Sequence, residues 1–308
     1  MSERQRGLAY GLGAYLLWGV FPLYFPLLEP TSPVEILANR IVWSFVVLAL
    51  VVVVGRRWAW IRPLSRDRRR LLLLAAAGLT LSLNWGVYIY GVNSEQVVQT
   101  SLGYFINPLV SVLFGVVLLR ERLRRAQWYA VALGAVAVLV LSVDYGGLPW
   151  IALVLAFSFG TYGLLKKVLD MGALESLTVE TALLTPIAGG YLLILVATGQ
   201  SALASGDVSL SLLLLSTGVV TAIPLLLFGA AATRIPLTWI GLLQYVAPVL
   251  QFLIGVVVYG EPMPTSRWIG FTLVWVALVV LAADSLVAVR RGRGVPEHEL
   301  EESAPEAH

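Results

Sequence analysis

The residues best suited to chemistry in this chain are amides, tyrosines and tryptophans inside two neighbouring apolar segments, 71–92 and 99–119. Asn84, Tyr88 and Gly91 are spaced by four and three residues, so one face of a helix would carry all three. Lipid cannot satisfy polar groups, and polar side chains in such segments must therefore face protein or water. The mixture of aromatic and amide groups favours a lined cavity over the alternative, simple hydrogen bonding between packed helices.

Similar aromatic and amide side chains recur in the other apolar segments. Aromatic rings would give a bound molecule tolerant apolar contact and cation–π attraction, and amides would fix its orientation. The residues that we predict to line a substrate-binding cavity are Trp18, Tyr24, Trp43, Asn84, Trp85, Tyr88, Tyr104, Asn107, Tyr162, Gln244 and Tyr245.

Three ionisable residues and two prolines are candidates for gating or coupling, namely Glu35, Arg40, Glu180, Pro108 and Pro248. An arginine inside a membrane is costly without a partner, and Glu180 is one candidate partner for Arg40, which could also attract a carboxylate of a substrate. Glu35 and Glu180 are candidate proton carriers, with solvated positions at the membrane interface as the alternative. Each proline removes a backbone hydrogen bond in mid-segment and would bend its helix.

Enzyme chemistry has little support among the residue types present. The chain has no cysteine and only two histidines, both of which lie in a polar C-terminal tail. No acidic cluster could hold Mg²⁺, and no Gly-Lys-Ser/Thr loop could hold phosphate. We therefore expect no metal, no cofactor, no nucleotide and no enzyme activity.

Composition places these residues in a membrane. Of 308 residues, 58% are hydrophobic and 13% are charged, against about a quarter charged in a soluble domain. An apolar run of about 20 residues is long enough to cross the hydrocarbon as a helix. The sequence predicts an all-α integral membrane protein with ten transmembrane helices, at about 7–27, 34–54, 71–92, 99–119, 126–143, 148–166, 177–197, 209–231, 236–258 and 267–288.

The distribution of positive charge predicts how these helices are oriented. Nearly all of the 21 lysine and arginine residues fall in segments on the same side as the N-terminus, with Arg267 on the other side and Arg40 in the membrane. Cytoplasmic loops carry an excess of Lys and Arg, so both termini are predicted to be cytoplasmic. Because the basic residues lie at helix ends, we expect no nucleic-acid partner despite a pI near 9.2.

One spacing of residues occurs twice, 140 positions apart, and divides the chain into halves. The first copy is Pro108, Gly115, Glu121 and Trp128, and the second is Pro248, Gly255, Glu261 and Trp268. Five helices per half would insert the second half in the opposite orientation, an inverted repeat typical of alternating access around a central site. We expect Glu121 and Glu261 to bind loop backbone rather than substrate.

Three units follow from this division. They are a first five-helix repeat at 1–146, a second at 147–290 and a disordered, acidic, cytoplasmic tail at 291–308.

The stretch Ser101-Leu-Gly-Tyr-Phe-Ile-Asn-Pro-Leu-Val110, followed by Leu119-Arg-Glu-Arg122, resembles the RarD (chloramphenicol-sensitivity) branch of the EamA-type drug/metabolite transporters. The similarity recurs along most of the chain and includes the run Arg40-Ile-Val-Trp43-Ser44. Relatives often carry His at the position of Asn39, so a role of that histidine cannot be transferred to this chain. The resemblance implies two EamA domains, ten helices and a central cavity that opens alternately to each side.

These patterns predict a secondary-active transporter or exporter of small organic solutes (metabolites, amino acids or drugs such as chloramphenicol) in the cytoplasmic membrane. Its partners would be a small-molecule substrate and the lipid bilayer, and proton coupling and facilitated diffusion both remain open. The assembled form would be a monomer or a homodimer. The alternatives are a passive facilitator or channel and, with less support, a membrane-embedded lipid enzyme.

Overall fold

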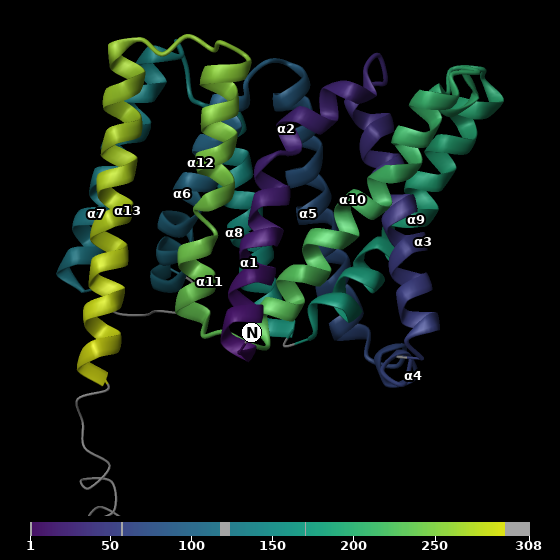
Figure 1. Ribbon diagram of the computed structural model, residues 1–308, viewed down its shortest axis with the longest axis horizontal. Coiled ribbons are helices and arrows are strands. Elements are labelled where there is room, and N and C mark those ends of the chain that lie inside the picture. The colour runs from purple at the N-terminus through teal and green to yellow at the C-terminus, as the bar shows by residue number, and fades with distance from the viewer. Residues whose placement is uncertain (1, 57, 118–123, 170, 293–308) are drawn as a thin grey trace, which may run out of the picture.

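The computed structural model describes residues 2–56, 58–117, 124–169 and 171–292. The regular structure in these ranges is helical, and the helices pack into a bundle with the N-terminus at one end (Figure 1). We call this end, which also carries α4 (Ile61–Leu64), the N-terminal end, and the other the distal end. Glu121 and the tail beyond residue 292 lie outside the described residues.

The other elements follow in chain order. They are α1 (Glu3–Gly19), α2 (Phe21–Tyr24), the 3₁₀ turn η1 (Phe25–Leu28), α3 (Pro33–Val54), α5 (Arg68–Asn93), α6 (Val97–Val117), α7 (Arg125–Asp144), α8 (Trp150–Leu169), α9 (Ala173–Ala197), the 3₁₀ turn η2 (Ala202–Ala204), α10 (Val208–Ala232), α11 (Leu237–Leu243), α12 (Val246–Leu253), the π-helical turn η3 (Ile254–Val258) and α13 (Thr265–Gly292).

The predicted all-helical membrane architecture is confirmed within these ranges. Nine helical segments are long and apolar enough to cross a membrane, and a tenth is a bent pair made of α1 and the segment Phe21–Leu28. These segments correspond to the ten predicted from the sequence. The prediction relied on the length of each apolar run, since a helix of about 20 apolar residues spans the hydrocarbon.

The first predicted helix is bent rather than continuous. α1 and the segment that follows it meet at an angle of 44°, with Val20 between them. Pro22 and Pro26 lie just beyond this break and cannot donate a backbone N–H to a preceding turn. The bend turns α2 and η1 away from the axis of α1.

The two matched prolines act differently in the two halves. α6 continues through Pro108, whereas the segment predicted at 236–258 is divided into α11, α12 and η3. The break before α12 lies at Gln244 and Tyr245, just ahead of Pro248. Residues Trp239–Val258 still form one candidate span, and its interruption lies near the proline that was expected to bend it, since Pro248 removes one backbone donor at this point.

Side-chain caps set where several helices start. Ser32 Oγ accepts a hydrogen bond from the backbone N–H of Glu35 at 3.3 Å, which fixes the first turn of α3. Asp67 does the same for α5 and Asp207 for α10. Such caps satisfy donors that the first turn leaves unpaired. The start of α3 in turn sets the depth of Glu35 and Arg40.

Glycines allow close contact between α3 and α10. A Cβ atom at Gly218 would lie 2.4 Å from the carbonyl oxygen of Trp43, so only glycine fits there. Small residues at such crossings bring helix backbones together in membrane proteins. The same pair of helices meets again at Arg40 and Thr221.

Candidate functional site

Arg40 lies inside a cage of aromatic rings contributed by α2, η1 and α5. Its Cζ atom is 4.0 Å from the centroid of the Trp85 ring and 5.5 Å from the rings of Phe21 and Phe25. Its Nε donates a hydrogen bond of 2.9 Å to Thr221 Oγ1 on α10. Arg40 is only 4% exposed, so the rings and the hydroxyl replace much of its hydration. One buried charge thus joins four elements to α3.

A polar network on α5 and α6 adjoins this cage. The ring of Tyr88 lies 5.9 Å from that of Phe25 and 5.8 Å from that of Tyr104. The Tyr104 hydroxyl donates a hydrogen bond of 3.0 Å to Asn84 Oδ1. Asn84 Nδ2 in turn donates to the oxygens of two residues on α8, each at 3.0 Å. The structure therefore brings together five of the predicted cavity residues: Tyr24, Asn84, Trp85, Tyr88 and Tyr104.

Tyr24 closes the cage on the side of α10. Its ring lies 5.5 Å from that of Phe25, and its hydroxyl donates a hydrogen bond of 2.8 Å to the carbonyl oxygen of Leu213. The Ser216 hydroxyl is also 2.8 Å from the Tyr24 hydroxyl. The residues of α2 and η1 are therefore held against α10 on one side and Arg40 on the other.

The pairing of Arg40 with Glu180 that the sequence suggested does not occur in this structure. Glu180 forms an ion pair with Lys166 at 3.0 Å, and no carboxylate of the described residues forms one with Arg40. Arg40 and Glu180 each lie seven residues, about 10 Å, inside their helices. α3 starts at the distal end and α9 at the N-terminal end, so the two side chains lie at different depths (Figure 1).

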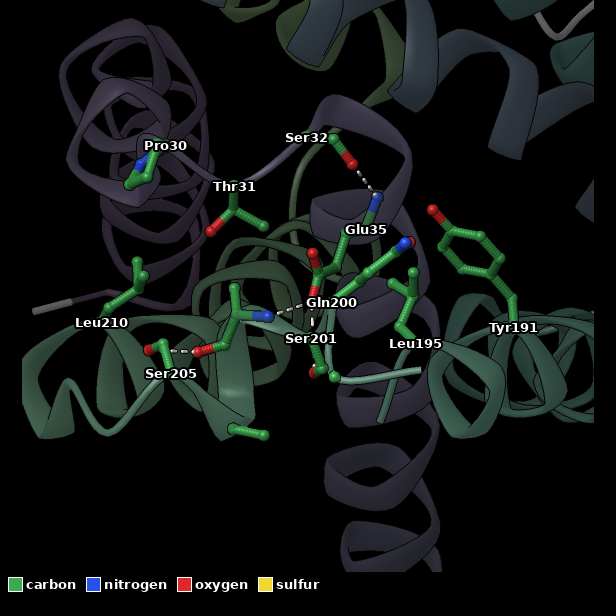
Figure 2. Close-up of a pocket in the computed structure, with 13 residues that line it drawn as sticks. Pro30, Thr31, Ser32, Glu35, Tyr191, Leu195, Gln200, Ser201, Ser205 and Leu210 are labelled. Carbon is green, nitrogen blue, oxygen red and sulfur yellow. Dashed lines mark hydrogen bonds between the residues drawn. The ribbon is translucent and has the colours of Figure 1, made fainter. Parts of the chain in front are cut away.

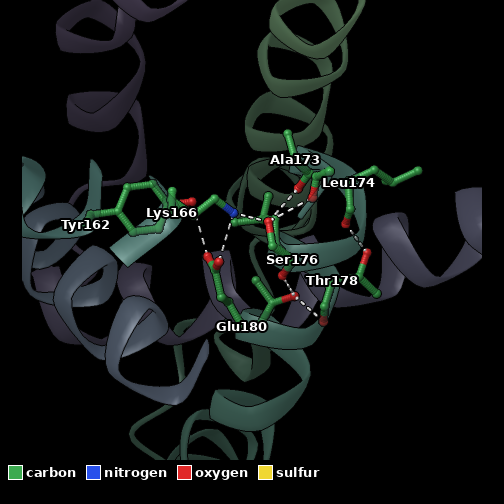
Figure 3. Close-up of polar contacts among 10 residues, drawn as sticks. Tyr162, Lys166, Ala173, Leu174, Ser176, Thr178 and Glu180 are labelled. Carbon is green, nitrogen blue, oxygen red and sulfur yellow. Dashed lines mark hydrogen bonds and ion pairs between the residues drawn. The ribbon is translucent and has the colours of Figure 1, made fainter. Parts of the chain in front are cut away.

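Glu180 is the centre of a second polar cluster (Figure 3). Its carboxylate accepts hydrogen bonds from Lys166 Nζ at 3.0 Å and from the Tyr162 hydroxyl at 3.2 Å. Lys166 Nζ also donates to the Ser176 hydroxyl. Glu180 is 0% exposed and Glu35 only 4%, so neither carboxylate is solvated as that alternative required.

Aromatic rings connect the cage with this second cluster. The Phe159 ring lies 5.9 Å from that of Tyr104 and 6.1 Å from that of Tyr162. Tyr162, one of the predicted cavity residues, therefore adjoins both the aromatic side chains near Arg40 and the carboxylate of Glu180. A continuous series of contacts thus runs from α3 to α9 through α5, α6 and α8.

Glu35 lines a cavity of about 510 Å³ at the distal end (Figure 2). One carboxylate oxygen, Oε1, accepts hydrogen bonds from the backbone N–H of Ala202 at 2.8 Å and from the Ser201 hydroxyl at 3.3 Å. The Thr31 hydroxyl, in the same lining, is buried and has no hydrogen-bond partner. Glu35 therefore ties the start of α3 to the connector between α9 and α10.

A second cavity, of about 530 Å³, lies at the N-terminal end. Its lining includes Trp60, Asp67, Arg70 and Glu175, from the connectors before α5 and before α9 and from the starts of these helices. The two cavities therefore lie at opposite ends of the bundle (Figure 1).

Of the remaining predicted cavity residues, Trp18 packs against the apolar cluster that contains Phe21 and Phe25, whereas the others make their described contacts elsewhere. Trp43 Nε1 donates to Asn39 Oδ1 at 3.2 Å, and the Trp18 ring packs 5.3 Å from that of Tyr15. Asn107 Oδ1 is buried without a hydrogen-bond partner. Gln244 and Tyr245 occupy the break between α11 and α12, where Tyr245 packs against a separate apolar cluster of α6, α7, α8, α12 and α13.

Glu261 binds backbone, as expected from its position just beyond a helix, but the backbone is that of a helix start rather than of a loop. Its two carboxylate oxygens lie 3.0 and 3.1 Å from the backbone nitrogen of Val98, in the first turn of α6. Burial raises the pKa of this carboxyl to about 7, while the backbone hydrogen bonds and Arg267 oppose the shift. Glu261 therefore fastens the connector between η3 and α13 to the first half of the chain.

Several residues of the site were not predicted. Phe21 and Phe25 form two sides of the cage, and their spacing of four would place them on one helical face. Lys166 was counted only among the basic residues at helix ends. Its partner Glu180 is about two turns from the start of α9, too deep to be expected within reach of a connector.

The chain is similar to known membrane transporters over most of its length. The profile of the EamA-like transporter family matches residues 5–143. The chain is 58% identical to the protein RarD of Streptomyces exfoliatus, over 99% of this chain and 95% of that protein. It is 44% identical to the uncharacterized transporter YojE of Bacillus subtilis, over 91% of this chain and 94% of that protein. One crystal structure, 20% identical, shares the fold with a TM-score of 0.55, over 89% of this chain and 97% of the other.

The helices and these similarities define a multi-pass transporter protein of the bacterial cell membrane. The chain belongs to the EamA-like transporter family, within its RarD branch.

Proposed function

We propose that this protein is a secondary-active transporter or exporter of small organic solutes that works by alternating access around the Arg40 cage. The solutes would be metabolites, amino acids or drugs such as chloramphenicol. The observation that carries this proposal is a set of reciprocal contacts between the two halves. Where a residue of the first half contacts a residue of the second, the repeat equivalents of both residues also contact each other.

The first exchanged contact involves two glycines. A Cβ atom at Gly19 would lie 2.7 Å from Leu250 Cδ1, and one at Gly160 would lie 3.0 Å from Val110 Cγ1. Gly160 follows Gly19 by 141 positions, and Leu250 follows Val110 by 140. Each glycine therefore meets the repeat equivalent of the other's partner. This is the contact pattern that two repeats related by a two-fold axis would produce.

A second exchanged contact involves other helices. Gly218 on α10 packs against Trp43 on α3, and Gly78 on α5 packs against Leu184 on α9. Gly218 follows Gly78 by 140 positions, and Leu184 follows Trp43 by 141. The pattern supports an inverted repeat at 1–146 and 147–290, in which rocking of one half would open the two end cavities in turn.

The proposed orientation has both termini in the cytoplasm, because the basic connectors lie at the N-terminal end.

The Lys166–Glu180 cluster, about 10 Å inside α9, is the best placed group for proton coupling. Glu35 is less suited, since Oε1 is already bound by a backbone N–H and a hydroxyl. A passive facilitator remains the alternative function. A lipid enzyme is disfavoured by the transporter names of the relatives.

A flux screen tests the proposed function. The purified chain would be reconstituted in proteoliposomes and challenged with metabolites, amino acids and chloramphenicol, with and without a pH gradient. We expect saturable, protein-dependent flux of at least one solute. Trp85→Ala should abolish this flux because it removes the ring next to Arg40, whereas Trp128→Ala, an exposed tryptophan on α7, should preserve it. Equal loss in both variants, or flux no greater than in protein-free liposomes across the panel, would contradict the proposal.

A further inference from the structure

Arg40 uses few of the hydrogen-bond donors that it has. A guanidinium carries five N–H donors and is protonated at any ordinary pH. Of the described residues, only Thr221 accepts a hydrogen bond from Arg40. An arginine that is 96% buried inside a membrane protein usually has an anionic partner, because an unpaired buried charge is costly. Within the described part of the chain, Arg40 thus has a charge and several donors without a partner of opposite charge.

The aromatic cage compensates this charge only in part. Trp85, Phe21 and Phe25 attract the guanidinium through their ring faces. Ring faces do not provide the directed acceptors that N–H donors need. They do provide an apolar surface beside the charge, which suits a ligand with both an anionic group and an apolar body.

A second unsatisfied polar group lies beside the first. The Tyr88 hydroxyl is buried and has no hydrogen-bond partner. The Tyr88 ring lies 5.9 Å from the ring of Phe25, which is itself 5.5 Å from Arg40 Cζ. The neighbouring hydroxyls are already used, since Tyr104 donates to Asn84 and Tyr24 donates to Leu213. A hydroxyl donor and a guanidinium together match the two oxygens of a carboxylate.

We propose that Arg40 and Tyr88 bind the carboxylate of an amphipathic organic anion, whose apolar body packs against Trp85, Phe21 and Phe25. This inference rests on the proposed transport function and narrows its substrate class. The guanidinium would bind the carboxylate through two parallel hydrogen bonds, which Lys cannot reproduce. The arginine would then exchange a costly unpaired state for a paired one each time substrate binds.

Ligand binding to the purified full-length protein tests this assignment. The probes are 3-phenylpropionate, the uncharged 3-phenylpropan-1-ol with the same skeleton, and chloride, followed by tryptophan fluorescence because Trp85 lies next to Arg40. We expect saturable binding of 3-phenylpropionate, at least tenfold weaker binding of the alcohol, and no comparable effect of chloride. Comparable affinity for acid and alcohol would overturn the proposal. A response to chloride that 3-phenylpropionate does not displace would show a site for inorganic anions only and would also overturn it.

Variants locate the effect at these two residues. Tyr88→Phe removes only a hydroxyl that lacks a protein partner, so it should fold normally and lower the affinity for 3-phenylpropionate about tenfold, without changing that for the alcohol. Arg40→Gln and Arg40→Lys should both remove the preference for the acid. Arg234→Gln, which changes an arginine at the N-terminal end, should leave it intact. An unchanged preference in Tyr88→Phe would contradict the assignment even if the Arg40 variants fail to fold.

Two results separate this inference from the proposed function. If a neutral solute shows saturable flux while 3-phenylpropionate neither binds nor competes, the anion site is wrong and transport stands. If 3-phenylpropionate binds as expected but no solute is carried in the flux screen, the anion site stands and the transport function is wrong.

Discussion

Lys166 Nζ lies 3.0 Å from Oε1 of Glu180, a carboxylate that is completely buried. The second oxygen of this carboxylate accepts a hydrogen bond from Tyr162. Two charges taken out of water are tolerated only when each is paired and hydrogen-bonded. The pair therefore makes α8 and α9 dependent on each other near the N-terminal end of the bundle.

Loss of one partner should cost far more than loss of both. We expect Lys166→Met to lower the free energy of unfolding by about 3–5 kcal/mol, because it leaves the Glu180 carboxylate buried and unpaired. The double variant Lys166→Met with Glu180→Leu should recover most of that loss. Thermal or denaturant unfolding in detergent measures both, with Arg70→Gln as control, since the Arg70–Asp67 pair is exposed and should contribute less than about 1 kcal/mol. Additive effects of the two substitutions would show that the residues are not coupled.

Adding one methyl group where α3 and α10 cross should destabilise the protein. Gly218→Ala would place Cβ against the Trp43 backbone, and we expect a loss of about 1–3 kcal/mol as the helices separate. Gly189→Ala is a matched control on α9, because nothing lies within 4 Å of a Cβ there. That control should be neutral or stabilising, by up to about 1 kcal/mol. Thermal unfolding of the two variants distinguishes close packing from a general intolerance of the helices to alanine.

Glu261 should make stability depend on pH. Its pKa is raised from 4.5 to about 7, chiefly by burial, so the folded protein holds this proton more tightly than the unfolded chain. The resulting stabilisation is present below pH 4.5 and is lost as pH rises from 4.5 through about 7.

The variant Glu261→Gln isolates this effect, because its amide oxygen can still accept from the Val98 N–H but does not titrate. As the pH rises from 4.5 to 7, we expect the Tm of the wild type to fall relative to that of the variant by on the order of 1 °C or more. A difference in Tm that stays constant across this window would exclude the assignment of the titration to Glu261.

The absence of cysteine gives a direct test of orientation. Ser205 is exposed at the distal end and Ser65 is exposed at the N-terminal end. In intact cells, a membrane-impermeant maleimide should label Ser205→Cys and should label Ser65→Cys only after permeabilisation. The reverse pattern would place both termini outside the cytoplasm.

Much of the architecture could be predicted because the membrane imposes simple constraints. The length of each apolar run set the helices, and the polar residues within 71–92 and 99–119 met as expected, at Asn84, Tyr88 and Tyr104. These residues follow helical spacing on neighbouring segments, so local periodicity was enough to bring them together.

The partner of Glu180 was not predicted. An inverted repeat places matched positions at opposite depths, which argues against contact with Arg40 but does not indicate which neighbouring side chain reaches the carboxylate. Sequence offset made Glu180 the equivalent of Asn39, but α3 and α9 start at opposite ends, which moves Glu180 away from Arg40 and towards Lys166. The bend at Val20 was also missed, although it is what brings Phe21 and Phe25 to the guanidinium. Hydropathy reports that a segment crosses the membrane and does not report where its axis turns.

Counterflow tests the central claim most directly. Proteoliposomes loaded with an unlabelled transported solute would be diluted into a trace of the labelled solute, and internal label would be followed over time. Alternating access around the Arg40 cage predicts a transient accumulation of label above the external concentration, abolished by Trp85→Ala and retained in Trp128→Ala. Unsaturable flux without such accumulation would contradict it and identify a channel instead.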